Sequence, residues 1–384
     1  MSKSYRWTLP LVGLAYLAVA CQGRGTNTES GKTLVVGAVL SQTGPAAAYG
    51  GDADKGARLA LETLAAESLP FKIRYVSQDD KSDKTEAAKV AQTLIDLDHV
   101  NVILGPAISP SALSVGKLAE ERQIPMVGTS PTLDEVTTSN TYDRKYVFRV
   151  CFNDSFQGKA LARFTVERLG KKSAAIVYDK TLPYSIGLAK TFREVFEKQG
   201  GQVKYEESYS VQDTDYSALI DKVADFDVDV LFIPGWDENV GPMLKQAEDR
   251  WDKFILLGGD AWPTNRLLDL AGGNIRNAYA LSHFIPEDPS PEVKQFDAAY
   301  RNKYGELPSP FAALGHDAMI LIADAAKRAA SLDGPTLRDA LAATKDLKLV
   351  TGTLSFDDKR NPKKDAVILQ IYPDHFAFFQ RITP

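Results

Sequence analysis

The chain has 384 residues, of which 44% are hydrophobic and 25% charged, and its formal net charge is −5. This composition excludes a disordered chain, and the length fits two domains. No block of basic residues is present, so nucleic acid is not expected as a partner. The four histidines are scattered and do not have metal-ligand spacing, so we expect no metal site. They are His99, His283, His316 and His375.

Residues 1–20 have the pattern of a secretory signal peptide. Lys3 and Arg6 precede an apolar run, Trp7–Ala20, that is too short to span a membrane as a mature helix. The run ends in Leu-Ala-Val-Ala-Cys21, which resembles a bacterial lipoprotein signal in which Cys21 becomes the lipidated first residue. Conventional cleavage is the alternative. Residues 21–32 are polar and rich in Gly and Ser, which is typical of a flexible tether. We therefore expect a periplasmic or extracytoplasmic protein that contacts the membrane only through a lipid on Cys21.

The first part of the mature chain alternates apolar runs with one-sided helical patterns. This order predicts a parallel sheet with right-handed crossovers and helices on its faces. No GxGxxG follows the first run, so a dinucleotide cofactor is not expected. The predicted strands are Thr33–Leu40, Phe71–Val76, Asn101–Gly105, Pro125–Gly128 and Tyr146–Val150.

Two hydroxyl-rich turns follow neighbouring strands of this predicted sheet. Ser109 precedes Pro110 after the first of the two strands, as an N-cap precedes the first residue of a helix. Ser130 and Thr132 lie in the turn after the second. Ordinary capping explains either turn alone, but ligands of open α/β sheets bind outside the carboxyl ends of the strands. The two turns together therefore predict a receptor for an anion such as a carboxylate.

The alternation restarts after Val150, which indicates a second sheet with its own strand-end loops. These loops carry Tyr184, Trp236 and Asp260, although such loops usually favour small polar residues. Packing is an alternative for each aromatic residue, and Asp260 could instead cap a helix near Pro263. Because these loops share one face, we predict that they line a ligand pocket. The predicted strands are Ala174–Tyr178, Val203–Tyr209, Asp229–Ile233, Phe254–Leu257 and Asn277–Phe284.

Three helices and a terminal group of short strands complete the predicted elements. Cys151 is expected to be a buried thiol, because Cys21 would be lipidated and no other cysteine is present. The helices are Pro291–Tyr304, Phe311–Ala330 and Pro335–Ala343, and the strands are Gly352–Phe356, Val367–Tyr372 and Phe376–Gln380.

From Lys32 to the C-terminus the sequence resembles the type I periplasmic solute-binding proteins, specifically the branched-chain amino acid receptors (Leu/Ile/Val-binding protein-like) that serve ABC importers. Six segments in order carry the resemblance: Gly37–Ala60, Val102–Ala112, Ile124–Thr132, the YSIG turn at Tyr184, GWDE at Gly235, and Gly258–Trp262. It implies two doubly wound parallel-sheet domains, joined by three crossings, that close on a ligand like a clamshell. The implied N-terminal lobe is 33–149 plus 285–352, and the C-terminal lobe is 150–284 plus 353–384.

The resemblance also implies roles for individual residues. Ser109 matches the donor to the ligand carboxylate, with Ser130 and Thr132 in the next turn. Asp260 matches the acid that pairs with the α-ammonium group. The aromatic surroundings of the amino group and side chain would be Tyr184 and Trp236 from the second domain, with Tyr49 and Ile108 on the first-domain wall.

The predicted function is therefore non-enzymatic. We expect a monomer that binds a small-molecule solute, an amino acid, and delivers it to an inner-membrane ABC permease without a cofactor. A ligand-sensing receptor subunit of the same fold is the alternative. An exported α/β hydrolase is a weaker one, because the chain lacks a G-x-S-x-G nucleophile elbow. Trp236 is larger than the tyrosine of typical leucine receptors, so a smaller, flatter or aromatic ligand stays open.

Overall fold

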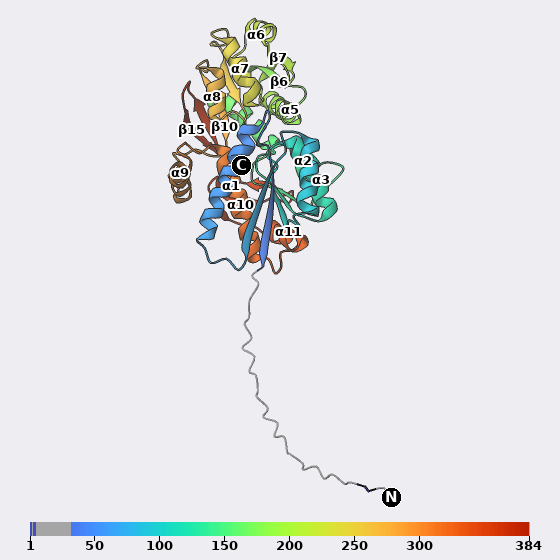
Figure 1. Ribbon diagram of the computed structural model, residues 1–384. Helices are drawn as coiled ribbons and strands as arrows, with labels where there is room; N and C mark the ends of the chain where they lie inside the picture. Colours follow the sequence, from blue (N-terminus) through green and yellow to red (C-terminus); the bar gives the residue numbers. More distant parts are fainter. Residues whose placement is uncertain (2, 5–31, 384) are drawn as a thin grey trace. The chain divides into compact units, whose positions relative to one another are not determined.

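The computed structural model describes residues 1, 3–4 and 32–383 (Figure 1). The predicted signal peptide and tether, with Cys21, lie almost entirely outside the described residues. The first sheet has five parallel strands in the order β2-β1-β3-β4-β5. The strands are β1 (Thr33–Leu40), β2 (Lys72–Asp79), β3 (Val102–Leu104), β4 (Met126–Gly128) and β5 (Val147–Arg149).

Helices cover both faces of the first sheet. Side chains alternate along each strand, so Val102 and Leu104 of β3 pack against helices on one face of the sheet, and Ile103 packs against helices on the other face. The short helix η1 (Asp134–Val136) precedes β5. The helices around this sheet are α1 (Ala47–Ala65), α2 (Lys84–Asp96), α3 (Ser109–Arg122), α9 (Pro291–Tyr304), α10 (Pro310–Arg328) and α11 (Gly334–Ala342).

The second sheet has seven strands in the order β15-β14-β10-β9-β8-β6-β7. Five are parallel: β6 (Ser173–Asp179), β7 (Gln202–Tyr209), β8 (Val230–Phe232), β9 (Ile255–Gly258) and β10 (Ala278–Ser282). The antiparallel pair β14 (Ala366–Ile371) and β15 (Phe376–Ile382) adds one edge. The helices are α4 (Asp154–Arg163), the π-helix η2 (Phe164–Arg168), α5 (Pro183–Lys198), α6 (Ser217–Ala224), α7 (Asp237–Ala247) and α8 (Asn265–Ala271).

The chain passes between the two sheets three times, after β5, after β10 and before β14. The doubly wound α/β fold predicted from the sequence is thus confirmed. A third, small sheet comprises β11 (Leu347–Leu349), β12 (Gly352–Phe356) and β13 (Pro362–Lys363).

The lobe boundaries stay a prediction. The small third sheet contacts the first lobe, since the ring of Phe356 lies 5.4 Å from that of Phe148 and Arg149 Nε donates to Asn361 Oδ1 at 2.7 Å. These contacts favour a last boundary beyond residue 361 rather than at residue 352.

Helices α1 and α10 are in near backbone contact. A methyl group on Gly56 would lie 1.8 Å from the carbonyl oxygen of Ala312, and one on Gly315 would lie 2.0 Å from that of Ala53. Only glycine permits this approach. It holds Tyr49, near the start of α1, against Phe311 at the start of α10, with ring centroids 4.6 Å apart.

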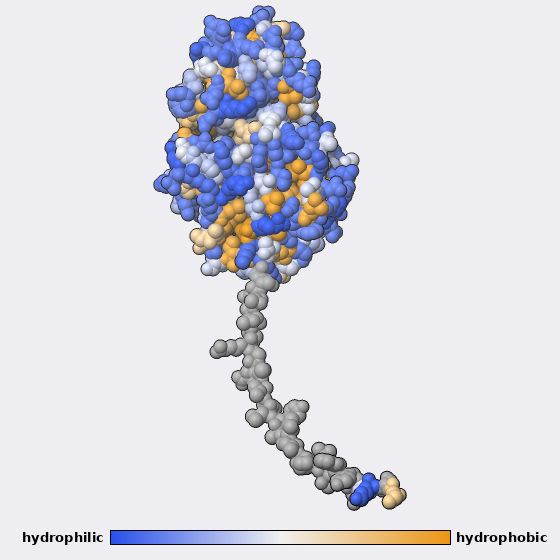
Figure 2. Space-filling model, in the orientation of Figure 1, coloured by the Kyte–Doolittle hydropathy of each residue, from blue (hydrophilic) through white to orange (hydrophobic). Residues whose placement is uncertain are grey.

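The surface is mainly hydrophilic, with apolar residues in small separate groups on the face shown in Figure 2. The large apolar side chains that are exposed among the described residues come from separate parts of the sequence; they include Leu97, Ile186, Leu307 and Phe378. Scattered exposure of this kind is normal for a folded domain.

Candidate functional site

A cavity with about 290 Å³ of empty volume lies among the loops that follow the strands of both sheets. Only about 20 Å³ of it is free for the centre of a water-sized sphere, so the lining side chains lie close together in this conformation. The structure brings together around it all eight residues singled out from the sequence, and three others. The lining residues are Tyr49, Ala107, Ile108, Ser109, Ser130, Thr132, Tyr184, Trp236, Asp260, Ala261 and Phe311. That the eight bind a ligand stays a prediction.

The turn after β3 presents Ser109 to the cavity. The N-cap of α3 is Ile108, and Ser109 is the first helical residue, so the prediction that Ser109 is the N-cap is wrong. Its hydroxyl therefore does not cap the helix: the Ser109 oxygen accepts a bond from the backbone N–H of Leu133 at 3.2 Å. The hydroxyl proton remains available for a ligand acceptor, beside the free N–H groups of a helix N-terminus.

The turn after β4 is fastened to its neighbours. The Ser130 hydroxyl donates to the carbonyl oxygen of Ala107 at 2.8 Å, which ties the two turns together. The Thr132 carbonyl accepts the Asp154 N–H at 2.9 Å, which joins this turn to the start of α4. The proton of the Ser130 hydroxyl is thus committed within the protein, so this oxygen faces the cavity as an acceptor.

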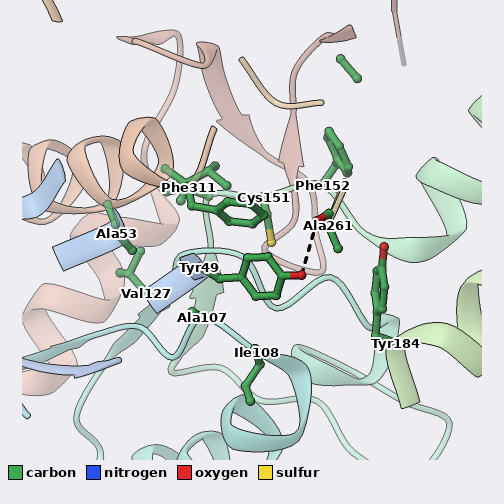
Figure 3. Packing of buried hydrophobic residues seen from close by; sticks show 14 of the residues in the cluster. Tyr49, Ala53, Ala107, Ile108, Val127, Cys151, Phe152, Tyr184, Ala261 and Phe311 are labelled. Carbon is green, nitrogen blue, oxygen red and sulfur yellow. Dashed lines mark hydrogen bonds between the residues drawn. The ribbon is translucent and has the colours of Figure 1, made fainter. Parts of the chain in front are cut away.

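Tyr49 reaches from α1 toward the loop after β9, where its hydroxyl lies 3.4 Å from the carbonyl oxygen of Ala261 (Figure 3). Its hydroxyl donates to Asp237 Oδ1 at 2.9 Å and accepts the Asp237 N–H at 3.0 Å. Asp237 Oδ2 accepts a bond from Thr264 at 2.7 Å. Burial raises the pKa of Asp237 to about 6. With its hydroxyl occupied, Tyr49 offers the cavity its ring, which packs edge-on against Trp236 at 6.2 Å.

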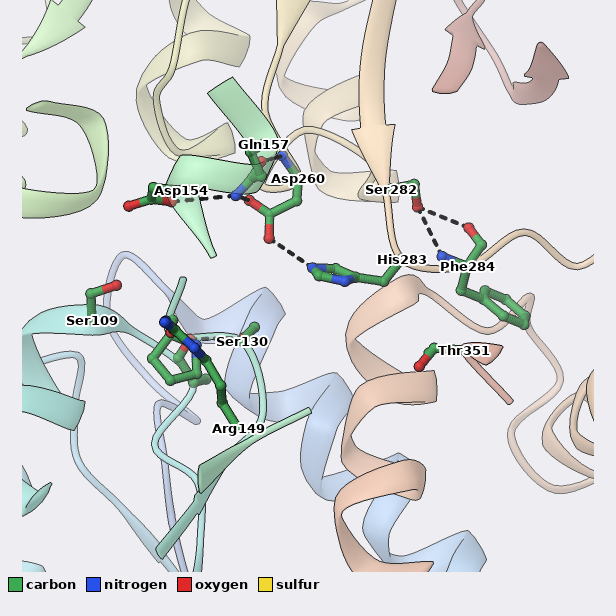
Figure 4. A network of polar contacts seen from close by, with 12 residues as sticks. Ser109, Ser130, Arg149, Asp154, Gln157, Asp260, Ser282, His283, Phe284 and Thr351 are labelled. Atoms are coloured by element: carbon green, nitrogen blue, oxygen red, sulfur yellow. Dashed lines mark hydrogen bonds and ion pairs between the residues drawn. The ribbon is translucent and has the colours of Figure 1, made fainter. Parts of the chain in front are cut away.

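Asp260 is held by two side chains on the opposite side of the cavity (Figure 4). Gln157 Nε2 donates to Asp260 Oδ1, and His283 Nε2 lies against Asp260 Oδ2, both at 2.9 Å. The N-cap of α8 is Thr264, so the alternative in which Asp260 caps that helix is excluded. Asp260 is therefore positioned by side chains and faces the cavity.

Two further polar groups next to Asp260 have incomplete bonding among residues 32–383. They are Asp154 Oδ2 and the hydroxyl of Tyr184, both fully buried. Burial is the main cause that raises the pKa of Asp154, and the negative charge of Asp260 adds to it. Burial, and then the charges of Asp260 and Asp154, raise the pKa of the Tyr184 hydroxyl. Within residues 32–383, neither Asp154 nor Asp260 forms an ion pair with a Lys or Arg side chain, so this side of the cavity fits a cationic group.

Sequence reasoning missed five residues that shape the site. Asp237 follows the noted Trp236 directly, and Phe311 is next to a helix start, so both had a weak signal. The partners of Gln157 and His283 lie 103 and 23 positions away, with no spacing that could reveal them. The missed residues are Asp154, Gln157, Asp237, His283 and Phe311.

Comparison with known proteins places this geometry in a family. The family model described as periplasmic binding protein matches residues 33–374. The chain is a member of the periplasmic binding protein family. The resemblance read from the sequence is confirmed, including the branched-chain amino acid group within it.

Individual relatives match over nearly their whole length. The chain is 27% identical to the Leu/Ile/Val-binding protein homolog 1 of Brucella abortus (strain 2308), over 93% of this chain and 94% of that protein. Among solved structures, the leucine binding protein LivK of Thermotoga maritima MSB8 has a TM-score of 0.86 at 31% identity and covers 91% of this chain and 99% of its own. The substrate-binding protein LivJ of Streptococcus pneumoniae, in complex with isoleucine, has a TM-score of 0.86 at 32% identity and covers 92% and 100%.

Family membership fixes the broad role. Periplasmic binding proteins are non-enzymatic solute-binding proteins that act outside the cytoplasm. The relatives above are named as binding proteins for leucine or Leu/Ile/Val, or as a branched-chain amino acid transporter substrate-binding protein. In residues 32–383, no helix is long and apolar enough to cross a membrane. That same part of the chain contains no group of three or more metal-binding side chains.

Proposed function

We propose that this protein is the substrate-binding protein of an ABC importer, that it binds an amino acid, branched-chain or related, and that it delivers the amino acid to a membrane permease. One observation carries the proposal: the cavity has a free hydroxyl donor at a helix N-terminus on one side and an uncompensated carboxylate, Asp260, on the other. Such opposite polarity suits a zwitterion.

In this proposal the ligand carboxylate binds Ser109 and the start of α3, and the ammonium group binds Asp260 and the oxygen of Thr132. The ligand side chain lies among the rings of Tyr49, Trp236 and Phe311. Charge-assisted hydrogen bonds contribute roughly 1.5–3 kcal/mol each. Three or four of them are enough for micromolar binding, about −8 kcal/mol, after the costs of closure.

Ligand binding is proposed to shift the two lobes toward a closed form. The direct bonds between Tyr49 and Asp237 join the lobes around the cavity and support this idea, because they form only when the lobes meet. A ligand that bridges both sides favours the closed form by its differential affinity. We further propose that the mature protein is monomeric and that a lipid on Cys21 anchors it to the membrane.

The test is a thermal-shift screen of the twenty L-amino acids, followed by calorimetry of those that stabilise the protein. We expect stabilisation by branched-chain or related amino acids and a dissociation constant at or below the micromolar range. The same assay with short amides and polyamines is the control for cations without a carboxylate. Stabilisation by none of the twenty amino acids would contradict the proposal.

A further inference from the structure

In the proposed function Asp260 pairs with the ligand ammonium group. The residue is held at three points, two on its carboxylate and one on its backbone N–H. Gln157 Nε2 donates to Oδ1 at 2.9 Å, and Gln157 Oε1 accepts the Asp260 backbone N–H at 3.1 Å. His283 Nε2 lies 2.9 Å from Oδ2. The Gln157 amide thus reads both the main chain and the side chain of Asp260, and all three residues are buried.

The His283 ring is placed by the segments that join the lobes. His283 directly follows β10, at the second crossing, and its ring stacks on that of Phe152, at the first crossing, with centroids 3.6 Å apart and planes at 22°. The orientation of the Asp260 carboxylate therefore depends on two crossing segments.

Both donors to Asp260 are uncharged at neutral pH. Burial lowers the pKa of His283 to about 4, although the nearby carboxylates of Asp260 and Asp317 act in the opposite direction; Lys364 adds to the lowering. A neutral imidazole carries one proton, and the acceptor Asp260 requires it on Nε2. His283 Nδ1 has no partner among the described residues, which agrees with a bare nitrogen there.

We propose that Gln157 and His283 are positioning residues that orient the Asp260 carboxylate without neutralising it, so that the cationic group of the ligand supplies the missing charge. A protein cation at either place would pair with Asp260 and remove its attraction for the ligand. The site would then select ligands with an ammonium group over otherwise identical carboxylic acids. This inference rests on the proposed function for the identity of the ligand.

Calorimetry with L-isoleucine on two His283 variants tests the inference. His283→Phe keeps a ring for the stack on Phe152 but removes the donor, whereas His283→Gln keeps an N–H donor. We expect about a tenfold loss of affinity for His283→Phe and less than a threefold loss for His283→Gln. In an Asp260→Asn background, His283→Phe should have almost no further effect, because the oriented charge is gone. Equal losses for the two variants, or an undiminished loss in the Asp260→Asn background, would overturn the assignment.

A second measurement needs no ligand and separates this inference from the proposed function. Nitrogen–proton correlation spectra of the histidine rings report which nitrogen carries the proton, and His283→Gln identifies the signal. We expect a neutral Nε2–H ring at pH 7 in the unmodified protein. A charged ring or an Nδ1–H ring would overturn the positioning role even if isoleucine binds. If no amino acid binds, the proposed function fails. A neutral Nε2–H ring would still support the hydrogen bond by which His283 orients the Asp260 carboxylate.

Discussion

Tyr49 and Asp237, 188 positions apart in the sequence, exchange two hydrogen bonds across the cavity: the phenol donates to the carboxylate and accepts the backbone N–H of the same residue. This pairing joins the helix α1 of one sheet to the helix α7 of the other. It is a direct polar link between the lobes, and it leads to the first prediction.

Tyr49→Phe should weaken L-isoleucine binding by about 5- to 30-fold. The substitution removes both hydrogen bonds that the buried Asp237 makes to the Tyr49 hydroxyl, a loss of roughly 1–2 kcal/mol in the closed form. Calorimetry measures the affinity, and small-angle scattering of the saturated protein measures closure. Tyr304→Phe is the matched control, because its hydroxyl donates to the carbonyl oxygen of Lys55 at 3.0 Å within one lobe. Equal affinities for the two variants would contradict the role of Tyr49 in closure.

Asp260→Asn should reduce the affinity for L-isoleucine at least tenfold, because the ammonium group loses its only charged partner in our proposal. Asp221→Asn, which alters an exposed carboxylate in the same lobe, is the control and should leave the affinity unchanged. Calorimetry at pH 7 compares the three proteins. An unaltered dissociation constant for Asp260→Asn would reject Asp260 as the ammonium partner.

Ser109→Ala should weaken binding of L-isoleucine about tenfold, since it removes a charge-assisted bond to the carboxylate. Ser114→Ala is the control on the same helix, where the hydroxyl donates to the Pro110 carbonyl oxygen at 3.4 Å. The assay is repeated with isoleucinamide, which lacks the carboxylate charge, and there the loss should be smaller. A loss of the same size with both ligands would show that Ser109 does not recognise the carboxylate.

The stability of the ligand-free protein should carry the signature of Asp237. Its pKa is raised to about 6 in the folded state, from 3.8, so between these pH values the folded state binds more protons than the unfolded state. The stabilising contribution is full below pH 4 and is lost as the pH rises through 6. His283 acts in the opposite direction, because its lowered pKa of about 4 destabilises the fold as the pH falls below 6.5.

These two effects offset each other in the unmodified protein, so the difference from Asp237→Asn is the informative quantity. Urea denaturation between pH 4.5 and 7 should show the unmodified protein losing roughly 2 kcal/mol relative to Asp237→Asn as the pH rises. Asp237→Asn also changes the hydrogen bonds of residue 237. That change shifts its free energy of unfolding by the same amount at every pH, so it does not affect how the two curves diverge with pH. Parallel curves would contradict the raised pKa.

The positions of the strands were predictable because the apolar runs are short and end in glycine or polar turns. The ends of the elements were less so: the second strand is Lys72–Asp79 rather than Phe71–Val76, since its polar last residues still pair with β1. At the site, strand-end position was enough to collect Ser109, Trp236 and Asp260.

Helix capping and long-range partners were not predictable in the same way. The Ser-Pro pair at Ser109 suits either the N-cap or the first helical turn, and the backbone angle of Ile108 decides between them. Gln157 looks like any polar residue of a helix, and only the three-dimensional path of the chain brings it to Asp260. Cavity residues at strand ends can be located from the sequence around them, whereas the side chains that orient these residues come from distant parts of the sequence.

The close approach of α1 and α10 at Gly56 and Gly315 sets the spacing of two aromatic residues that line the cavity. An added methyl group at either glycine would force the helices apart and separate the ring of Tyr49 from that of Phe311. The space between these two rings would then be wider, and in our proposal the site would accept a larger solute although no residue that contacts the solute has changed. Solute specificity could thus change through substitutions at Gly56 or Gly315, which lie outside the cavity lining.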